Sequence, residues 1–158
     1  MTLVLVVDSS DISPWGSNWA WSLPLIVVTV IFHAYFLGLL NQRVTSVLAG
    51  RGRIRGIDIV SLSVVGGTAV CATVFHAIEV SMWAALYFLL GALPNRKIAM
   101  LYSLGAMTTY GNAHLNLESQ WQLMGSLEAL NGWILFGLTT AFLFTVIREV
   151  WSYSNQSP

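Results

Sequence analysis

Three apolar runs, each long enough to cross a lipid bilayer, limit what this chain can fold into more than any other feature. They extend from Ser22 to Leu40, from Ile59 to Leu93 and from Trp121 to Trp151. An α-helix rises about 1.5 Å per residue and the hydrocarbon core is about 30 Å thick, so about 20 apolar residues suffice for one crossing. We therefore expect an all-α integral membrane protein whose solvent is the lipid bilayer.

The composition points the same way. Hydrophobic residues make up 56% of the 158 residues and charged residues only 9%, whereas soluble domains carry about 25% charged residues. The formal net charge is zero and no basic face recurs, so we expect no nucleic-acid partner. The sequence contains no recognisable nucleophile triad, phosphate loop or metal-ligand cluster, so we expect neither enzymatic activity nor a cofactor.

Charged residues between the apolar runs predict an orientation. Arg43, Arg51, Arg53 and Arg55 follow the first run and Arg148 lies near the end of the last. Basic residues gather on the cytoplasmic side of membrane proteins, so three crossings would leave the N-terminus outside and the C-terminus inside. We expect a multi-pass protein of the bacterial inner membrane. Two basic residues, Arg96 and Lys97, fall on the outer side and oppose this assignment.

The runs divide the chain into five parts. These are an extracytoplasmic segment 1–21, an additional N-terminal transmembrane helix 22–42, a basic cytoplasmic loop 43–58, a main membrane domain 59–151 and a polar tail 152–158. The run of residues 59–93 would make a helix of about 52 Å, longer than the bilayer is thick. Either it forms one long tilted helix that projects from the bilayer, or it breaks near Gly66-Gly67.

Residues 94–120 are too short to cross the membrane and must leave and return on the same side. Asn95 is a typical N-cap and predicts a short helix over 95–107, whereas 108–120 has no helical pattern. Non-helical backbone at membrane depth is tolerated only when it is buried in protein or lines a wet cavity. A short helix followed by extended Thr/Gly-containing backbone can hold a cation through carbonyl oxygens. One chain supplies one wall of such a pathway, so we expect a homotetramer.

Residues 107–114, Met-Thr-Thr-Tyr-Gly-Asn-Ala-His, resemble the selectivity filter of potassium channels, especially of small bacterial ion channels with one pore loop per subunit. The likeness extends upstream to His76-Ala77-Ile78-Glu79, Trp83-Ala84 and Tyr87, and downstream to residues 121–132 and Leu135-Phe136-Gly137. The resemblance spans about residues 60–151. It implies a pore domain with an outer helix 59–93, a pore helix 95–107, a filter 108–114 and an inner helix 121–151.

The resemblance also implies roles for single residues. The ion-conducting filter would comprise Thr108, Thr109, Tyr110, Gly111, Asn112 and Ala113. The backbone carbonyls of Thr109, Tyr110 and Gly111 would hold a permeant monovalent cation, K⁺ or Na⁺. Asn112 stands where the family has tyrosine, Ala113 where it has a second glycine, and His114 where it has an acidic residue. Because alanine adopts positive φ only at a cost, we expect weakened K⁺ selectivity.

A second alignment matches Tyr110-Gly111 with the Tyr-Gly of the family filter. It requires the deletion of two residues before Tyr110 and breaks the register with Trp121. Both alignments place the filter in the same segment, and they differ in how much of its outer half is altered.

Ionisable residues within the runs offer two interpretations each. His76 and Glu79 lie one helical turn apart and would form a pH-sensing pair that controls gating, or Glu79 would bond to the pore-helix backbone or the inner helix. Glu128 would support the back of the filter or lie at the membrane surface. His33 in the first run is expected to be a lone hydrogen-bond partner between helices, at a different depth from His76 and His114.

The remaining candidates lie at the mouth and in the last helix. In a tetramer, Glu118 and His114 would form outer rings that attract or repel cations, although Glu118 is also explained as an ordinary surface charge. Gly132 or Gly137 would be a gating hinge, or would simply permit close helix packing.

Two functions follow from these residues. The first is a tetrameric cation channel of potassium-channel type that is gated within the membrane or by an unknown regulatory partner. The second, favoured by the altered positions Asn112 and Ala113, is a non-conducting membrane scaffold or regulatory subunit that retains the pore-loop fold.

Overall fold

The structure is a computed structural model that describes residues 12–50, 59–111 and 114–155, with side chains described over 15–153 of these ranges. Predictions that fall on residues 1–11, 51–58, 112–113 and 156–158 lie outside the described residues. They include Arg51, Arg53 and Arg55 of the expected basic loop, and Asn112 and Ala113 of the expected filter.

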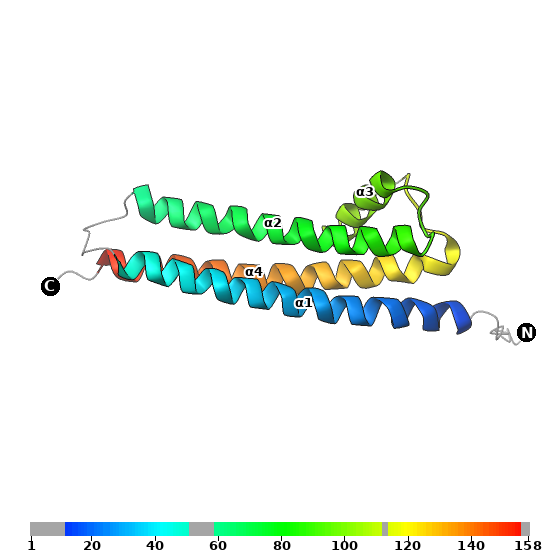
Figure 1. Cartoon of the computed structure of the whole chain (residues 1–158), viewed down its shortest axis with the longest axis horizontal. Helices are drawn as coiled ribbons and strands as arrows, with labels where there is room; N and C mark the ends of the chain where they lie inside the picture. The colour runs from blue at the N-terminus through cyan, green and yellow to red at the C-terminus, as the bar shows by residue number, and fades with distance from the viewer. Residues whose placement is uncertain (1–11, 51–58, 112–113, 156–158) are drawn as a thin grey trace, which may run out of the picture. The chain divides into compact units, whose positions relative to one another are not determined.

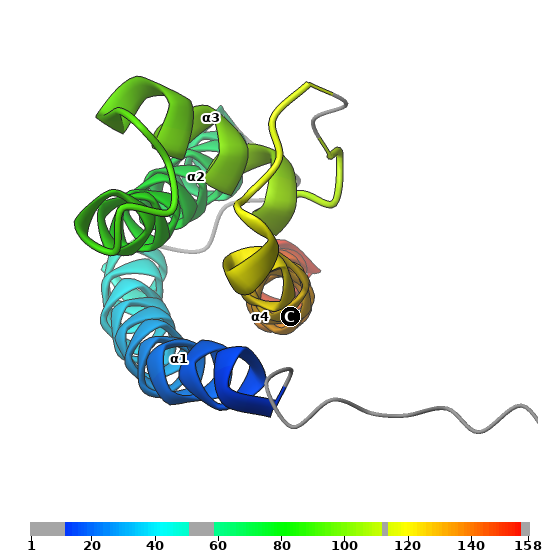
Figure 2. The same ribbon diagram turned by 90° about the vertical axis from the view of Figure 1, so that its right-hand side faces the viewer.

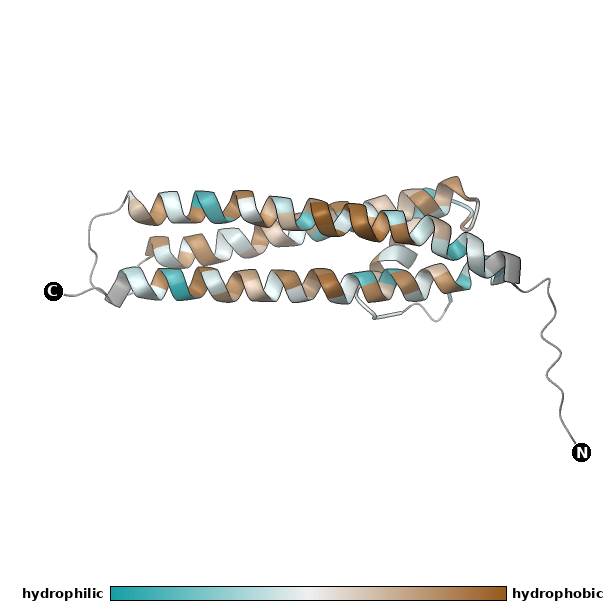
Figure 3. Ribbon diagram, turned by 90° about the horizontal axis from the view of Figure 1, so that it is seen from below, coloured by the Kyte–Doolittle hydropathy of each residue, from teal (hydrophilic) through white to brown (hydrophobic). Residues whose placement is uncertain are grey.

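The described residues form helices and no strand, so the prediction of an all-α fold is confirmed. The helices are α1 (Ile12–Ala49), α2 (Ile59–Leu89), α3 (Arg96–Met107), the short 3₁₀ turn η2 (Ser119–Trp121) and α4 (Gln122–Asn155) (Figure 1). Three stretches, in α1, in α2 and over η2 and α4, are long and apolar enough to cross a membrane. Figure 3 shows apolar residues along each of the three long helices.

The first helix is longer than the expected span 22–42. It begins before residue 22 and continues through Arg43 to Ala49, which places the first part of the expected loop 43–58 in a helix. Val44 and Leu48, one turn apart, are buried there against Val146 and Val150 of α4. Apolar residues at helical spacing thus continue past Arg43, and their burial against α4 accounts for the longer helix.

The second helix runs through Gly66-Gly67 without a break and ends at Leu89, before the expected boundary at residue 93. Gly91 has a φ of +68°, which glycine adopts freely. The N–H of Gly91 donates to the carbonyl of Phe88 (3.2 Å) and that of Ala92 to the carbonyl of Tyr87 (2.9 Å). These two bonds form a Schellman motif, which closes α2 and turns the chain toward α3.

The chain forms two compact units, Met1–Val28 with Val80–Gly132, and Thr29–Glu79 with Trp133–Pro158. We call the first the α3 unit and the second the histidine unit, and describe each by itself. The three long helices contribute residues to both units.

In the α3 unit, α3 lies against α2, and the loop that follows it returns to the start of α4 (Figure 2). The Asn95 side chain caps α3 by accepting a hydrogen bond from the N–H of Ile98 (2.9 Å), as its sequence position predicts. Asn18 of α1 accepts a hydrogen bond from the N–H of Met124 (3.0 Å) and donates one to the carbonyl of Gln120 (2.6 Å). This one side chain therefore connects α1 to the beginning of α4.

In the histidine unit, α1, α2 and α4 meet in a small apolar core. Its members are Val44, Leu48, Val146 and Val150, with Val64, Val65 and Phe142 packed against them. Large apolar side chains such as Ile31 and Phe144 stay exposed on its surface. Such a surface suits contact with lipid or with other chains rather than with water.

Candidate filter segment and buried polar clusters

The chain reverses direction immediately after α3. The final carbonyls of the helix, those of Leu104, Gly105 and Ala106, accept hydrogen bonds of 3.0–3.1 Å from the N–H groups of Thr108, Gly111 and Thr109, in that order. Helix ends leave such carbonyls without partners unless the following chain supplies donors. We expected extended backbone from residue 108 onward, but residues 108–111 turn back on the helix end, because the N–H groups of Thr108, Thr109 and Gly111 cap α3.

The turn places two residues in the left-handed region. Thr109 has a φ of +56° and Gly111 a φ of +73°. Glycine adopts this conformation without strain, whereas a residue with a Cβ atom loses about 1–2 kcal/mol. The glycine of the expected filter is therefore required by the backbone, and Thr109 is held in place by the bonds around it.

The carbonyl oxygens of Thr109, Tyr110 and Gly111 accept no hydrogen bond from any residue that the structure describes. The Tyr110 residue is 88% exposed. The N–H groups of Thr108, Thr109 and Gly111 thus bind to α3, while the carbonyl oxygens to which the resemblance assigns the cation have no partner among the described residues.

A hollow of about 540 Å³ lies beside this segment in the α3 unit. Its walls include Thr109 and Gly111 on one side and Gly125 and Ser126 of α4 on another. Part of the expected filter backbone therefore has open space next to it instead of a packed side chain.

Two glycines of α4 allow α3 to pack closely against it. A Cβ atom at Gly132 would lie 2.1 Å from the carbonyl oxygen of Met107, and one at Gly125 would lie 2.2 Å from the hydroxyl oxygen of Tyr102. A Cβ atom at Gly137 would meet no atom within 4 Å. Of the two suggested hinge residues, Gly132 is thus a close-packing position, and Gly137 has free space around it.

Glu128 of α4 is fully buried and connects α4 to α2 and α3. Its carboxyl group accepts a hydrogen bond from the Tyr87 hydroxyl (2.8 Å) and a short one from the Ser103 hydroxyl. The Ser103 oxygen also lies 2.9 Å from the carbonyl oxygen of Val80. Glu128 therefore links α4 to α3, and its side chain does not reach solvent.

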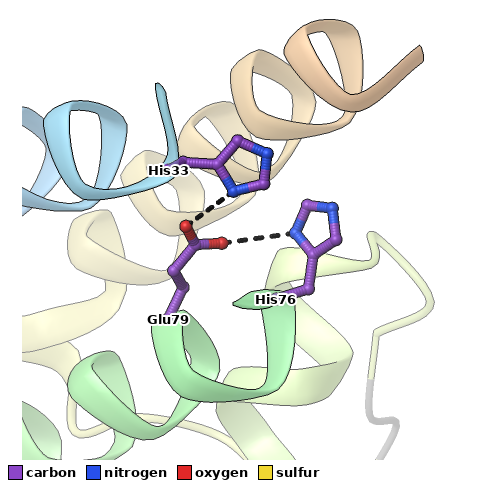
Figure 4. Close-up of side chains that lie close together, drawn as sticks. All are labelled: His33, His76 and Glu79. Carbon is purple, nitrogen blue, oxygen red and sulfur yellow. Dashed lines mark hydrogen bonds and ion pairs between the residues drawn. The ribbon is translucent and has the colours of Figure 1, made fainter. Parts of the chain in front are cut away.

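The histidine unit holds a second buried polar cluster, shown in Figure 4. The two oxygens of the Glu79 carboxyl group face one histidine each: Oε1 lies 2.8 Å from Nδ1 of His33, and Oε2 lies 3.3 Å from Nδ1 of His76. The Thr139 hydroxyl of α4 lies 2.9 Å from Nε2 of His33 and 3.1 Å from Nε2 of His76. His33 and Glu79 have no exposed side-chain surface, and the side chain of His76 is 16% exposed.

His33 is a hydrogen-bond partner between helices, as expected, because its ring contacts Glu79 of α2 and Thr139 of α4. The prediction that it stands alone, at another depth than His76, is wrong. Its depth was inferred from a helix of residues 22–42, but α1 begins earlier and ends later. The pair of His76 and Glu79 follows from their spacing, whereas His33 and Thr139 join it from other helices. The signal that predicts such a cluster is that ionisable residues within membrane spans usually pair with one another.

The residues expected at the outer mouth are exposed. His114 and Glu118 lie in the loop between α3 and α4, and the Gln120 side chain donates a hydrogen bond to Glu118 (2.9 Å).

Arg96, one of the two basic residues that oppose the orientation rule, places its guanidinium group over the ring of Phe88 at 5.3 Å. This cation–π contact gives the charge a local partner.

No protein-family model, curated protein or solved structure matches this chain. Its function must therefore be argued from its own residues and geometry.

Proposed function

We propose that this chain is the subunit of a homotetrameric pore-loop cation channel of potassium-channel type, with weakened K⁺ selectivity. In this proposal α3 is the pore helix and residues 108–113 form the filter. The observation that carries the proposal is the turn after α3, which leaves the carbonyl oxygens of Thr109, Tyr110 and Gly111 without partners among the described residues. Rings of such carbonyls, one set from each chain, replace the hydration shell of a cation.

The length of α3 supports this assignment. Its 12 residues correspond to about 18 Å of helix, which is too short for a hydrocarbon core of about 30 Å. It lies in the chain between two helices of membrane-spanning length. If such a short helix ends within the membrane, the non-helical backbone that follows must be buried in protein or line a wet cavity.

The contacts that hold α3 support it as well. A filter must keep its carbonyl oxygens in fixed positions, so the helix before it must be fixed too. Glu128 and Ser103 fasten the middle of α3, and the carbonyl oxygen of Met107 at its end rests against the Cα atom of Gly132.

A tetramer accounts for the apolar surface of α3. Leu101 and Leu104 are exposed on this helix, and Tyr110 is exposed beyond it. Neighbouring chains around a central axis would cover these side chains. We propose that the channel lies in the bacterial inner membrane, with its N-terminus outside and its C-terminus in the cytoplasm.

Weak selectivity follows from the outer half of the filter. Asn112, Ala113 and His114 replace the tyrosine, the second glycine and the acidic residue of the related filters. The hollow beside Thr109 and Gly111 leaves that backbone without the bracing side chain that would fix its carbonyls at the spacing K⁺ requires.

Reversal potentials test this proposal. With K⁺ on one side of a planar bilayer and Na⁺ on the other, we expect the pure protein to give a reversal potential close to zero. The double substitution N112Y/A113G, which restores the family residues, is expected to move the potential toward that of a K⁺-selective pore. As a control, Glu118→Gln removes a charge near the mouth and should change conductance but not the ratio of permeabilities.

Two results would count against the weakened filter. One is a wild-type channel with strict K⁺ selectivity. The other is a folded N112Y/A113G tetramer whose reversal potential equals that of the wild type.

A non-conducting scaffold or regulatory subunit is the second candidate. The observation that favours it is the turn itself, because the N–H groups of Thr109 and Gly111 close the segment onto α3 instead of leaving it extended. A folded tetramer that passes no cation would support this alternative.

A further inference from the structure

The hydrogen-bond donors and acceptors of the cluster formed by His33, His76, Glu79 and Thr139 do not balance when Glu79 is ionised and both histidines are neutral. If Glu79 is ionised and both histidines are neutral with their Nδ1–H groups toward it, both Nε2 atoms are acceptors. The Thr139 hydroxyl lies between these two atoms but has one proton. In addition, Nδ1 of His76 and Oε2 of Glu79 are buried and have no hydrogen-bond partner among the described residues, although they lie 3.3 Å apart.

A cation between the two Nδ1 atoms and the carboxyl group would satisfy every one of these atoms. Both histidines would then carry their protons on Nε2 and donate them to Thr139, whose hydroxyl oxygen has two lone pairs. Both Nδ1 lone pairs would point toward the Glu79 carboxylate. Histidines that bind a metal nearly always donate their second N–H in this manner.

From this geometry we propose that His33, His76 and Glu79 bind one divalent transition-metal ion of the zinc class. The candidate ligand atoms of the three side chains all lie within 4.8 Å of one another. Bonds of about 2.0–2.2 Å from a tetrahedral zinc ion place its ligands about 3.3 Å apart. The Glu79 oxygens lie 2.8 Å and 3.3 Å from the two Nδ1 atoms, so binding would require the three side chains to adjust toward this spacing.

The ligand set determines the class of ion. Two imidazole nitrogens and one carboxylate oxygen suit zinc and its neighbours in the first transition row, whereas Ca²⁺ and Mg²⁺ prefer oxygen ligands throughout. Three protein ligands leave a fourth tetrahedral position for water, and the side chain of His76 has some exposed surface. The ion would connect α1 to α2. Thr139 of α4 would orient both imidazole rings by accepting their Nε2–H groups. This inference does not depend on the proposed cation pathway.

Metal binding by the full-length chain in detergent tests the proposal. After treatment with a chelator, the protein is dialysed against ZnCl₂ and its zinc is measured by elemental analysis. We expect one Zn²⁺ per chain, which His33→Gln and Glu79→Gln should each abolish. Thr139→Val should weaken binding by about 10–100-fold, because it removes the partner that orients both rings. The matched control is His114→Gln, since His114 is an exposed histidine outside the histidine unit.

The proposal is overturned if the wild type binds no zinc, or if His33→Gln retains as much as the wild type. In the first case the four side chains share protons in a closed ring instead. If the variants do not fold, Co²⁺ added to the wild type decides the matter. Intense visible bands of tetrahedral Co²⁺ support the site, and the weak spectrum of hydrated Co²⁺ rules it out.

Discussion

Gly132→Ala is expected to detach α3 from α4 and to abolish cation flux. The new Cβ atom would lie 2.1 Å from the carbonyl oxygen of Met107 and 2.9 Å from its carbonyl carbon. These are backbone atoms at the last residue of α3, so no side-chain rotation relieves the overlap and the whole helix end must move. Overpacking within a core costs about 1–3 kcal/mol and sometimes more, and we expect the upper end of that range. Thermal unfolding of the detergent-solubilised protein measures the loss.

Gly137→Ala is the matched control for this substitution. Gly137 lies in the same helix, but a Cβ atom there meets nothing within 4 Å, and alanine is a better helix former than glycine. We expect unchanged or slightly higher stability. A Gly132→Ala protein as stable as the Gly137→Ala protein would show that α3 does not rest on α4 at this point.

Glu128→Leu is expected to be the second most damaging substitution. It removes the acceptor of the buried Tyr87 hydroxyl and one of the two partners of Ser103. A buried polar group that loses its partner costs about 1–3 kcal/mol, so we expect a loss of about 2–3 kcal/mol in the free energy of unfolding. Glu118→Leu, at an exposed glutamate of the same region, should change stability little.

A double-mutant cycle separates this hydrogen bond from packing effects. Tyr87→Phe in the Glu128→Leu protein removes the unpartnered hydroxyl. The double variant should therefore lose less free energy of unfolding than the sum of the losses of the two single variants. Strict additivity in folded variants would mean that Glu128 and Tyr87 do not interact.

The four α-helices of the described residues were predictable because they follow from local patterns, whereas the short turn η2 was not predicted. Each of the three apolar runs overlaps one stretch of membrane-spanning length, and Asn95 marks the start of α3. The ends of α1 and α2 were less predictable. Burial of Val44 and Leu48 against α4 extends α1 into residues 43–49. We had predicted a loop there because of Arg43.

The contacts between distant residues were predictable only in part. The spacing of His76 and Glu79 indicates a pair, but nothing local points to His33 or Thr139, because their approach depends on how separate helices pack. The same holds for Gly132, whose need for glycine comes from the end of α3 and not from its own helix. The turn at Thr109 differs from the extended backbone that the filter resemblance implies, because the N–H groups of that segment cap α3.

Cation flux into liposomes that contain only this protein tests the central claim most directly. We expect the wild-type tetramer to pass Tl⁺, K⁺ and Na⁺ above the rate of empty liposomes. The Gly132→Ala protein should pass none, and Gly38→Ala, at an open position of α1, should equal the wild type. A correctly folded wild-type homotetramer whose flux of all three ions equals that of empty liposomes would contradict the assignment of residues 108–113 as a cation pathway.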